Sequence, residues 1–108
     1  DAPQTDFIVL LQDEYPDGRI LNIQEGGRTV RTAGGGVKRA DVDIWATGYQ
    51  VKAGHRLRAV ITSSWFPRFN RSPNTGAGPK EAVELRKANQ KIHLGGEKPS
   101  HLILPLFK

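Results

Sequence analysis

The hydroxyl, imidazole and carboxylate side chains of this 108-residue chain do not follow an order that would build a hydrolytic site. A serine nucleophile normally stands on a strained Gly-x-Ser-x-Gly turn, with an acid and a base within reach. Ser63 and Ser64 lie outside any such pentapeptide, and no aspartate follows them. Glu81 or Glu84 ahead of His93 would be the remaining acid and base. We therefore predict no catalytic residue, and the chain by itself is not expected to be an enzyme.

Residues that could hold a metal or a phosphate also lack the required spacing. Three histidines lie on separate segments, without a pattern such as His-x-x-x-His: His55, His93 and His101. Asp41 and Asp43 lie two residues apart and could share a cation, but a solvated face balanced by arginines is the favoured interpretation. The glycines at 34–36 and 76–78 match neither nucleotide-binding glycine pattern. The sequence thus predicts no metal and no cofactor.

Charge is divided unevenly along the chain. The net charge is +5, yet residues 1–51 carry five basic and eight acidic groups, whereas residues 52–108 carry eleven basic and three acidic groups. Because the first half of the chain is acidic and the second half basic, their charges are expected to pair within one domain, and a nucleic-acid surface is disfavoured. There is no cysteine, which is compatible with a reducing cytoplasm without requiring one, and no apolar run approaches the length of a membrane span. We expect one small domain with no nucleic-acid or membrane partner.

Alternation of apolar and polar residues, bounded by Gly, Pro and Asn, is the main structural signal, and it predicts an all-β chain. We expect strands at residues 5–12, 19–24, 28–31, 39–46, 56–64, 82–86, 90–94 and 101–106. The first is apolar on both faces and should be central. A helical turn within 79–88 is the alternative to the strand at 82–86. Short strands of this kind suit a β-sandwich or jelly roll.

The connections between these strands carry recognisable turn residues. Tyr-Pro-Asp-Gly at residues 15–18 predicts a turn, as does Lys-Ala-Gly-His at 52–55. Gly26 and Gly27 predict a tight reversal, and the glycines at 34–36 a flexible connection. Residues 64–79 hold three of the seven prolines, so we expect a long irregular loop there.

That loop contains the side chains best suited to contact a partner, and its composition favours order. Its interface candidates are three aromatic and two basic residues: Trp65, Phe66, Arg68, Phe69 and Arg71. Closure of the domain's own core is the alternative for Phe66 and Phe69. Asp6 interrupts an apolar strand, so we predict an ion pair between Asp6 and Arg68 or Arg71, with an exposed strand start as the alternative.

Two adjoining motifs carry a family resemblance. Gly-His-Arg-Leu-Arg at residues 54–58 leads into Ser-Ser-Trp-Phe-Pro-Arg-Phe-Asn-Arg-Ser-Pro-Asn-Thr-Gly at 63–76. They resemble the C-terminal domain of the X-Pro dipeptidyl-peptidase, cocaine esterase and α-amino-acid ester hydrolase family, where a Gly-His-Arg strand start leads to a Ser-Ser-x-Phe-Pro-Arg loop ending in Asn-Thr-Gly. Flanking segments agree in collinear order: Thr-Asp-Phe at 5–7, Tyr-Pro-Asp-Gly-Arg at 15–19, Ile-Trp at 44–45 and Pro-Ser-His-Leu-Ile-Leu-Pro at 99–105.

The resemblance implies a galactose-binding-like jelly roll packed beside an α/β-hydrolase domain that holds the Ser-Asp-His triad. No triad residue can be carried over to this chain. Residues 1–108 are expected to form a partial domain, the C-terminal portion of the jelly roll, with open strand edges that invite homo-oligomers. Departures concern loops: Trp65 and Asn70 stand where the family often has Asn and Asp, the connection at 34–36 is short, and Gly-Gly-Glu-Lys at 95–98 replaces a more acidic turn.

The expected function is therefore that of a non-catalytic accessory domain, which supports or gates the catalytic domain of an acyl esterase or an X-Pro dipeptidyl-peptidase. A carbohydrate-binding module is an alternative by fold analogy, with Trp65 and either Phe66 or Tyr49 as the sugar platform. A purely structural or oligomerising domain is the third interpretation.

Overall fold

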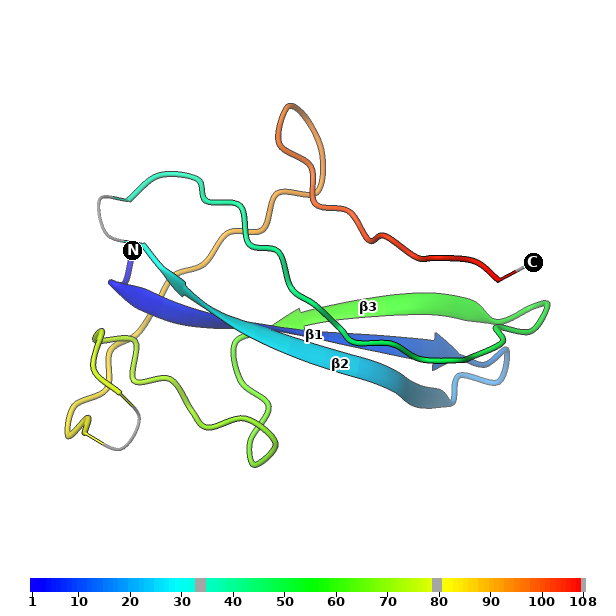
Figure 1. The fold of residues 1–108 in the computed structure, drawn as a ribbon, viewed down its shortest axis with the longest axis horizontal. Coiled ribbons are helices and arrows are strands. Elements are labelled where there is room, and N and C mark those ends of the chain that lie inside the picture. The colour runs from blue at the N-terminus through cyan, green and yellow to red at the C-terminus, as the bar shows by residue number, and fades with distance from the viewer. Residues whose placement is uncertain (33–34, 79–80, 108) are drawn as a thin grey trace.

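One antiparallel sheet organises the computed structural model, which describes residues 1–32, 35–78 and 81–107. Its strands are β1 (Gln4–Glu14), β2 (Ile20–Arg31) and β3 (Arg56–Thr62). Their order is β2-β1-β3, so β1 lies between the other two (Figure 1). The described residues form no helix, and so none that could cross a bilayer. The all-β prediction is confirmed, while closure into a jelly roll stays a prediction.

β1 is buried on both of its faces. Ile8 and Leu10 point to one side, the even face, whereas Thr5, Leu11 and Asp13 point to the other, the odd face. None of these five side chains is more than 4% exposed. A strand with this much apolar surface on both sides is stable only between two covering layers. The prediction that this strand is central is confirmed.

The two predicted turns join the strands as expected. After β1, the Gly18 amide donates to the Tyr15 carbonyl at 2.9 Å, and the Tyr15 amide donates to the Arg19 carbonyl at 2.8 Å. Gly18 has a φ of 88°, which glycine adopts without strain. Before β3, the His55 amide donates to the Lys52 carbonyl at 3.1 Å. Both turns are confirmed, as is the strand at 56–64, which ends at Thr62.

The reversal predicted at Gly26 and Gly27 is wrong, because β2 continues through both residues to Arg31. The role of these two glycines is to let other segments of the chain pack close to the backbone of β2. A Cβ on Gly26 would overlap the Asp43 carbonyl oxygen, and one on Gly27 would lie 3.1 Å from the Phe69 ring. Adjacent strand residues point to opposite faces, so the two glycines admit one covering segment on each face.

Residues 39–46 do not form the predicted strand; they cross the odd face of β2 as an irregular segment. Side chains of β2 hold this segment: Arg28 donates to the Asp41 carbonyl at 2.9 Å, and Gln24 donates to the Ala46 carbonyl at 3.2 Å. Trp45 has a φ of 65°, which breaks the extended backbone that alternation requires. The segment lies over the face of the sheet, so it cannot join the ladder at its edge.

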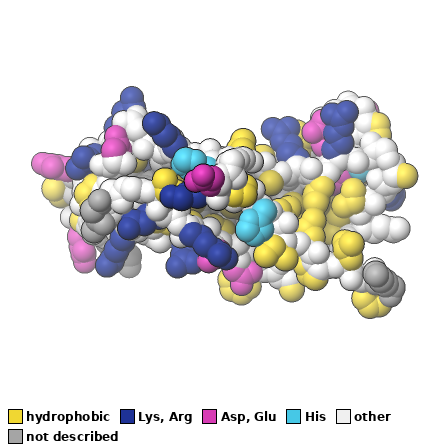
Figure 2. Space-filling view, turned by 90° about the horizontal axis from the view of Figure 1, so that it is seen from above, with side chains coloured by type: hydrophobic (Ala, Val, Ile, Leu, Met, Phe, Trp, Pro, Cys, Tyr) yellow, Lys and Arg dark blue, Asp and Glu magenta, His cyan; other side chains and the backbone are white. Residues whose placement is uncertain are grey.

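The strands predicted at 82–86, 90–94 and 101–106 are also wrong, since none of these described residues lies in a strand or a helix. Alternation reports a half-buried surface, whereas a ladder also needs a neighbouring backbone. Within residues 90–106 the structure shows one backbone hydrogen bond, from the amide of Ser100, which precedes the last segment, to the carbonyl of His93 at 2.8 Å. Leu94, Ile103 and Leu106 are exposed. Figure 2 views the molecule from above. It shows hydrophobic side chains gathered in the half of the molecule where the C-terminal segment of Figure 1 runs.

We expect Gly26→Ala to lower the free energy of unfolding by about 2 kcal/mol, because the added methyl group displaces the segment around Asp43. Gly48→Ala is the matched control: its Cβ would meet no atom within 4 Å, so the change should stay within about 0.5 kcal/mol. Urea unfolding of the polypeptide that carries this chain measures both. Equal stability of the two variants would show that Asp43 does not pack on Gly26.

Candidate interaction surface

The segment after β3 covers the even face of β1 and β2. Residues 64–78 contain no strand or helix, which confirms the predicted irregular loop up to Gly78; Pro79 lies outside the described residues. We name residues 65–76 the aromatic loop. Within it the Phe69 amide donates to the Trp65 carbonyl at 3.0 Å. The Phe69 ring lies over Gly27, beside Ile8, and so covers this part of the even face.

The three aromatic side chains of the loop divide between inside and outside. Phe69 is half-buried against the sheet, as the core alternative predicted for it. Phe66 is 68% exposed and Trp65 36% exposed, so core closure does not describe Phe66. These two outward aromatic side chains, Trp65 and Phe66, form the apolar part of the candidate surface.

Arg68 anchors the loop to β2. Its Nε donates to Glu25 Oε1 at 2.8 Å, and its guanidinium carbon lies 6.0 Å from the centre of the Phe69 ring. The arginine is largely exposed, so the pair orients the loop more than it stabilises the fold.

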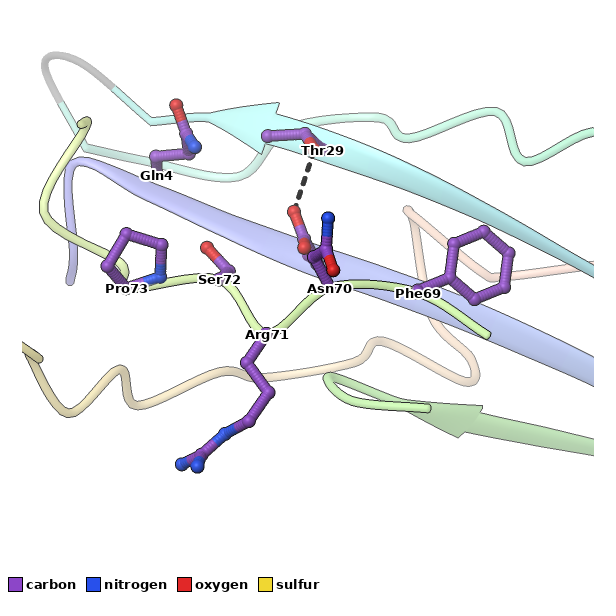
Figure 3. A pocket seen from close by; sticks show the side chains of 8 residues that line it. Gln4, Thr29, Phe69, Asn70, Arg71, Ser72 and Pro73 are labelled. Atoms are coloured by element: carbon purple, nitrogen blue, oxygen red, sulfur yellow. Dashed lines mark hydrogen bonds between the residues drawn. The ribbon is translucent and has the colours of Figure 1, made fainter. Parts of the chain in front are cut away.

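The predicted ion pair of Asp6 with Arg68 or Arg71 is wrong. Asp6 instead accepts a hydrogen bond from Thr29 Oγ1 at 2.7 Å, and no basic group in the described ranges lies within salt-bridge distance of it. The strand register explains this: Asp6 lies opposite Thr29, whereas Glu25 lies opposite Leu10, nearer to Arg68. Figure 3 shows the Arg71 side chain pointing away from Thr29.

The opposite end of the loop is also held. Pro73 is buried, and its carbonyl accepts the Arg86 amide at 2.9 Å. Asn74 has a φ of 60°, a conformation that asparagine tolerates, and its side-chain amide donates to the Arg86 carbonyl at 2.9 Å. Two separate anchors therefore hold the aromatic loop against the rest of the chain.

A shallow groove of about 210 Å³ runs between the loop and the even face (Figure 3). Its lining combines amide, hydroxyl and carboxylate groups with one aromatic ring: Gln4, Asp6, Thr29, Phe69, Asn70, Arg71, Ser72 and Pro73. A smaller hollow of about 90 Å³ beside it shares Asp6, Thr29 and Phe69. These groups can exchange hydrogen bonds with a ligand, but none is paired as a nucleophile with a base.

The residues considered for hydrolysis or metal binding stay apart. Within the described parts of the chain, no serine hydroxyl is hydrogen-bonded to a histidine, and no three His, Asp or Glu side chains come together as ligands. Asp41 is paired with Arg39 at 2.8 Å, in line with the interpretation of a balanced face. Tyr49 lies near the Arg56 end of β3 and Trp65 follows its other end, so they form no common sugar platform.

One polar cluster was missed in the sequence. The carboxylate of Asp13 is 1% exposed and binds both Tyr49 and His55. The Tyr49 hydrogen bond, followed by that from His55, lowers the pKa of Asp13 despite its burial, and the same bond raises the pKa of Tyr49 to about 12. The signal was available: Asp13 is two residues after Leu11 and so shares its buried face, where a carboxylate needs partners.

Two comparisons with known proteins match most of the chain. A family model described as the X-Pro dipeptidyl-peptidase C-terminal non-catalytic domain matches residues 1–103. The chain is also 33% identical, over an alignment of 119 residues, to a cocaine esterase of Rhodococcus sp. (strain MB1 Bresler). The alignment covers 99% of this chain and 21% of the esterase, so the chain spans about a fifth of the length of that curated relative.

We expect Phe69→Ala to lower the free energy of unfolding by about 2 kcal/mol, because it uncovers Ile8 and leaves a cavity above Gly27. Phe66→Ala removes the same ring from a mostly exposed position, so its effect should stay within about 0.5 kcal/mol. Urea unfolding compares the two variants. A larger loss for Phe66→Ala would contradict the placement of these rings.

Proposed function

This chain belongs to the family of X-Pro dipeptidyl-peptidase C-terminal non-catalytic domains, and we propose that it is the accessory domain of a larger serine hydrolase of the acyl esterase or X-Pro dipeptidyl-peptidase type. The observation that carries the proposal is the family match over residues 1–103, together with the likeness to one fifth of an esterase. The resemblance predicted from the motifs is confirmed by the same matches.

The aromatic loop is the part of the chain that we assign to contact with the catalytic domain. Trp65 and Phe66 offer apolar area outward, and buried aromatic side chains dominate the energy of protein interfaces. The anchors at Arg68 and Pro73 hold the loop before any partner arrives, so little conformational entropy is lost on contact. Support or gating of the catalytic domain through this loop is the role we propose.

The proposed position within a larger hydrolase also accounts for the apolar side chains that the C-terminal segments expose, because other parts of that protein would cover them. Among these side chains are Leu94, Ile103 and Leu106. In a jelly roll, further strands would cover them and extend the sheet. Alternatively, a second copy of the chain could cover these side chains by pairing its sheet edge with this one. The mass of the polypeptide in solution distinguishes the two, because only the second requires a dimer.

Hydrolysis in the whole enzyme is expected to be independent of the two serines of this chain. Ser63→Ala and Ser64→Ala should leave kcat/KM for p-nitrophenyl esters or X-Pro anilides within about twofold, because neither hydroxyl has a histidine partner in the described residues. The chain expressed alone should hydrolyse neither substrate. Loss of turnover on replacing either serine would contradict the accessory role.

Trp65→Ala in the full-length hydrolase should weaken the contact between its domains. We expect the free energy of unfolding of the catalytic domain to fall by about 2 kcal/mol, with faster thermal inactivation. The control is Phe107→Ala, an exposed aromatic truncation outside the matched residues 1–103. If Trp65→Ala instead destabilises only this domain and activity is unchanged, Trp65 is a core residue and the interface assignment fails.

A further inference from the structure

The buried carboxylate of Asp13 ties together three segments at the end of the sheet opposite the aromatic loop. Tyr49 Oη donates to Oδ2 at 2.5 Å. His55 Nδ1 lies 2.9 Å from Oδ1 and 3.0 Å from Oδ2. The His55 side chain is itself only 10% exposed. No buried side-chain polar atom in the described ranges lacks a hydrogen-bond partner, so the carboxylate is fully satisfied.

Contacts around this carboxylate bring two turns together. The His55 ring packs on the Tyr15 ring, with centroids 4.3 Å apart and planes tilted by 49°. The Arg19 guanidinium carbon lies 4.5 Å from the centre of the Tyr15 ring. Gly54 lies against Pro16, since a Cβ at Gly54 would be 3.7 Å from the proline ring. The turn after β1 and the turn before β3 therefore form one unit around Asp13.

The charge of Asp13 is what this arrangement requires. An ionised carboxylate accepts hydrogen bonds at both oxygens, whereas a protonated one must turn one oxygen into a donor. Tyr49 donates from one side, and His55 faces the other side across the start of β3. Lys52 adds a favourable positive charge from the intervening turn. Asp17 is engaged with Arg19 at 2.8 Å and does not contact the cluster.

We propose that ionised Asp13 acts as a latch that holds residues 49–55 against the β1–β2 hairpin, and that protonation of Asp13 releases this segment. The latch goes beyond the proposed accessory function and does not depend on it. It regulates the order of an outer turn, not a catalytic step. Since the folded state lowers the pKa of Asp13, the stabilisation is complete above the usual aspartate pKa of about 3.9 and is lost as the pH falls through the lower folded value.

Trypsin cleavage after Lys52, in the full-length protein near pH 8, tests the latch. Asp13→Asn keeps the shape but removes the charge, and we expect cleavage at Lys52 to accelerate about tenfold to a hundredfold, the range set by loss of hydrogen bonds to a buried charged group. Cleavage after Lys87, which is exposed and remote in sequence, should keep its rate. Unchanged cleavage at Lys52 would overturn the proposal.

Asp41→Asn is the matched control, because it removes the same charge from an exposed side chain that is paired with Arg39 and lies outside the two turns. Its cleavage at Lys52 should stay within about twofold of the parent protein; an equal acceleration would reveal a general charge effect and overturn the latch. If Asp13→Asn fails to fold, Tyr49→Phe replaces it: this variant removes one donor and leaves the His55 contact. It should accelerate cleavage about threefold to tenfold, and no change would likewise reject the proposal.

Discussion

Coverage of β1 on both faces is the constraint on which the rest of the structure depends. On its even face, Phe69 covers Ile8. Its odd face is covered near Asp13 by Tyr49 and His55, and near Thr5 by Gln90, whose amide donates to the threonine hydroxyl. A strand that is apolar on both sides cannot face water on either, so segments distant in sequence must converge on it. The loops of this chain are placed by that need.

The paired glycines of β2 and the two ends of the sheet express the same constraint. Gly26 and Gly27 point to opposite faces, and each lets a covering segment approach the sheet backbone. At one end of the sheet the aromatic loop is ordered by Arg68 and Pro73, which leaves Trp65 and Phe66 directed outward. At the other end Asp13 orders the turns. A contact surface and a polar latch are thus separated along one sheet.

Much of this arrangement follows from residues that act locally. The apolar run of β1 predicts a central strand, and Pro16 with Gly18 predicts the turn that follows it. The family motifs at 54–58 and 63–76 identify the domain. The spacing of Asp13 to Leu11 was enough to predict that Asp13 is buried. The residues next to it in sequence do not indicate its partners, Tyr49 and His55, which lie 36 and 42 residues away.

Residue chemistry by itself established the all-β class, the turns at 15–18 and 52–55, the central strand and the lack of a hydrolytic order among the serines and histidines. Tertiary structure decided that Gly26 and Gly27 continue a strand, that residues 39–46 cross a face, and that Arg68 binds Glu25 while Asp6 binds Thr29. The physical reason is that turn and strand preferences act over a few residues, whereas partners depend on strand register and on which segments pack above the sheet. A glycine's freedom and a carboxylate's need for a donor are local properties, but the atoms that meet them come from elsewhere in the chain.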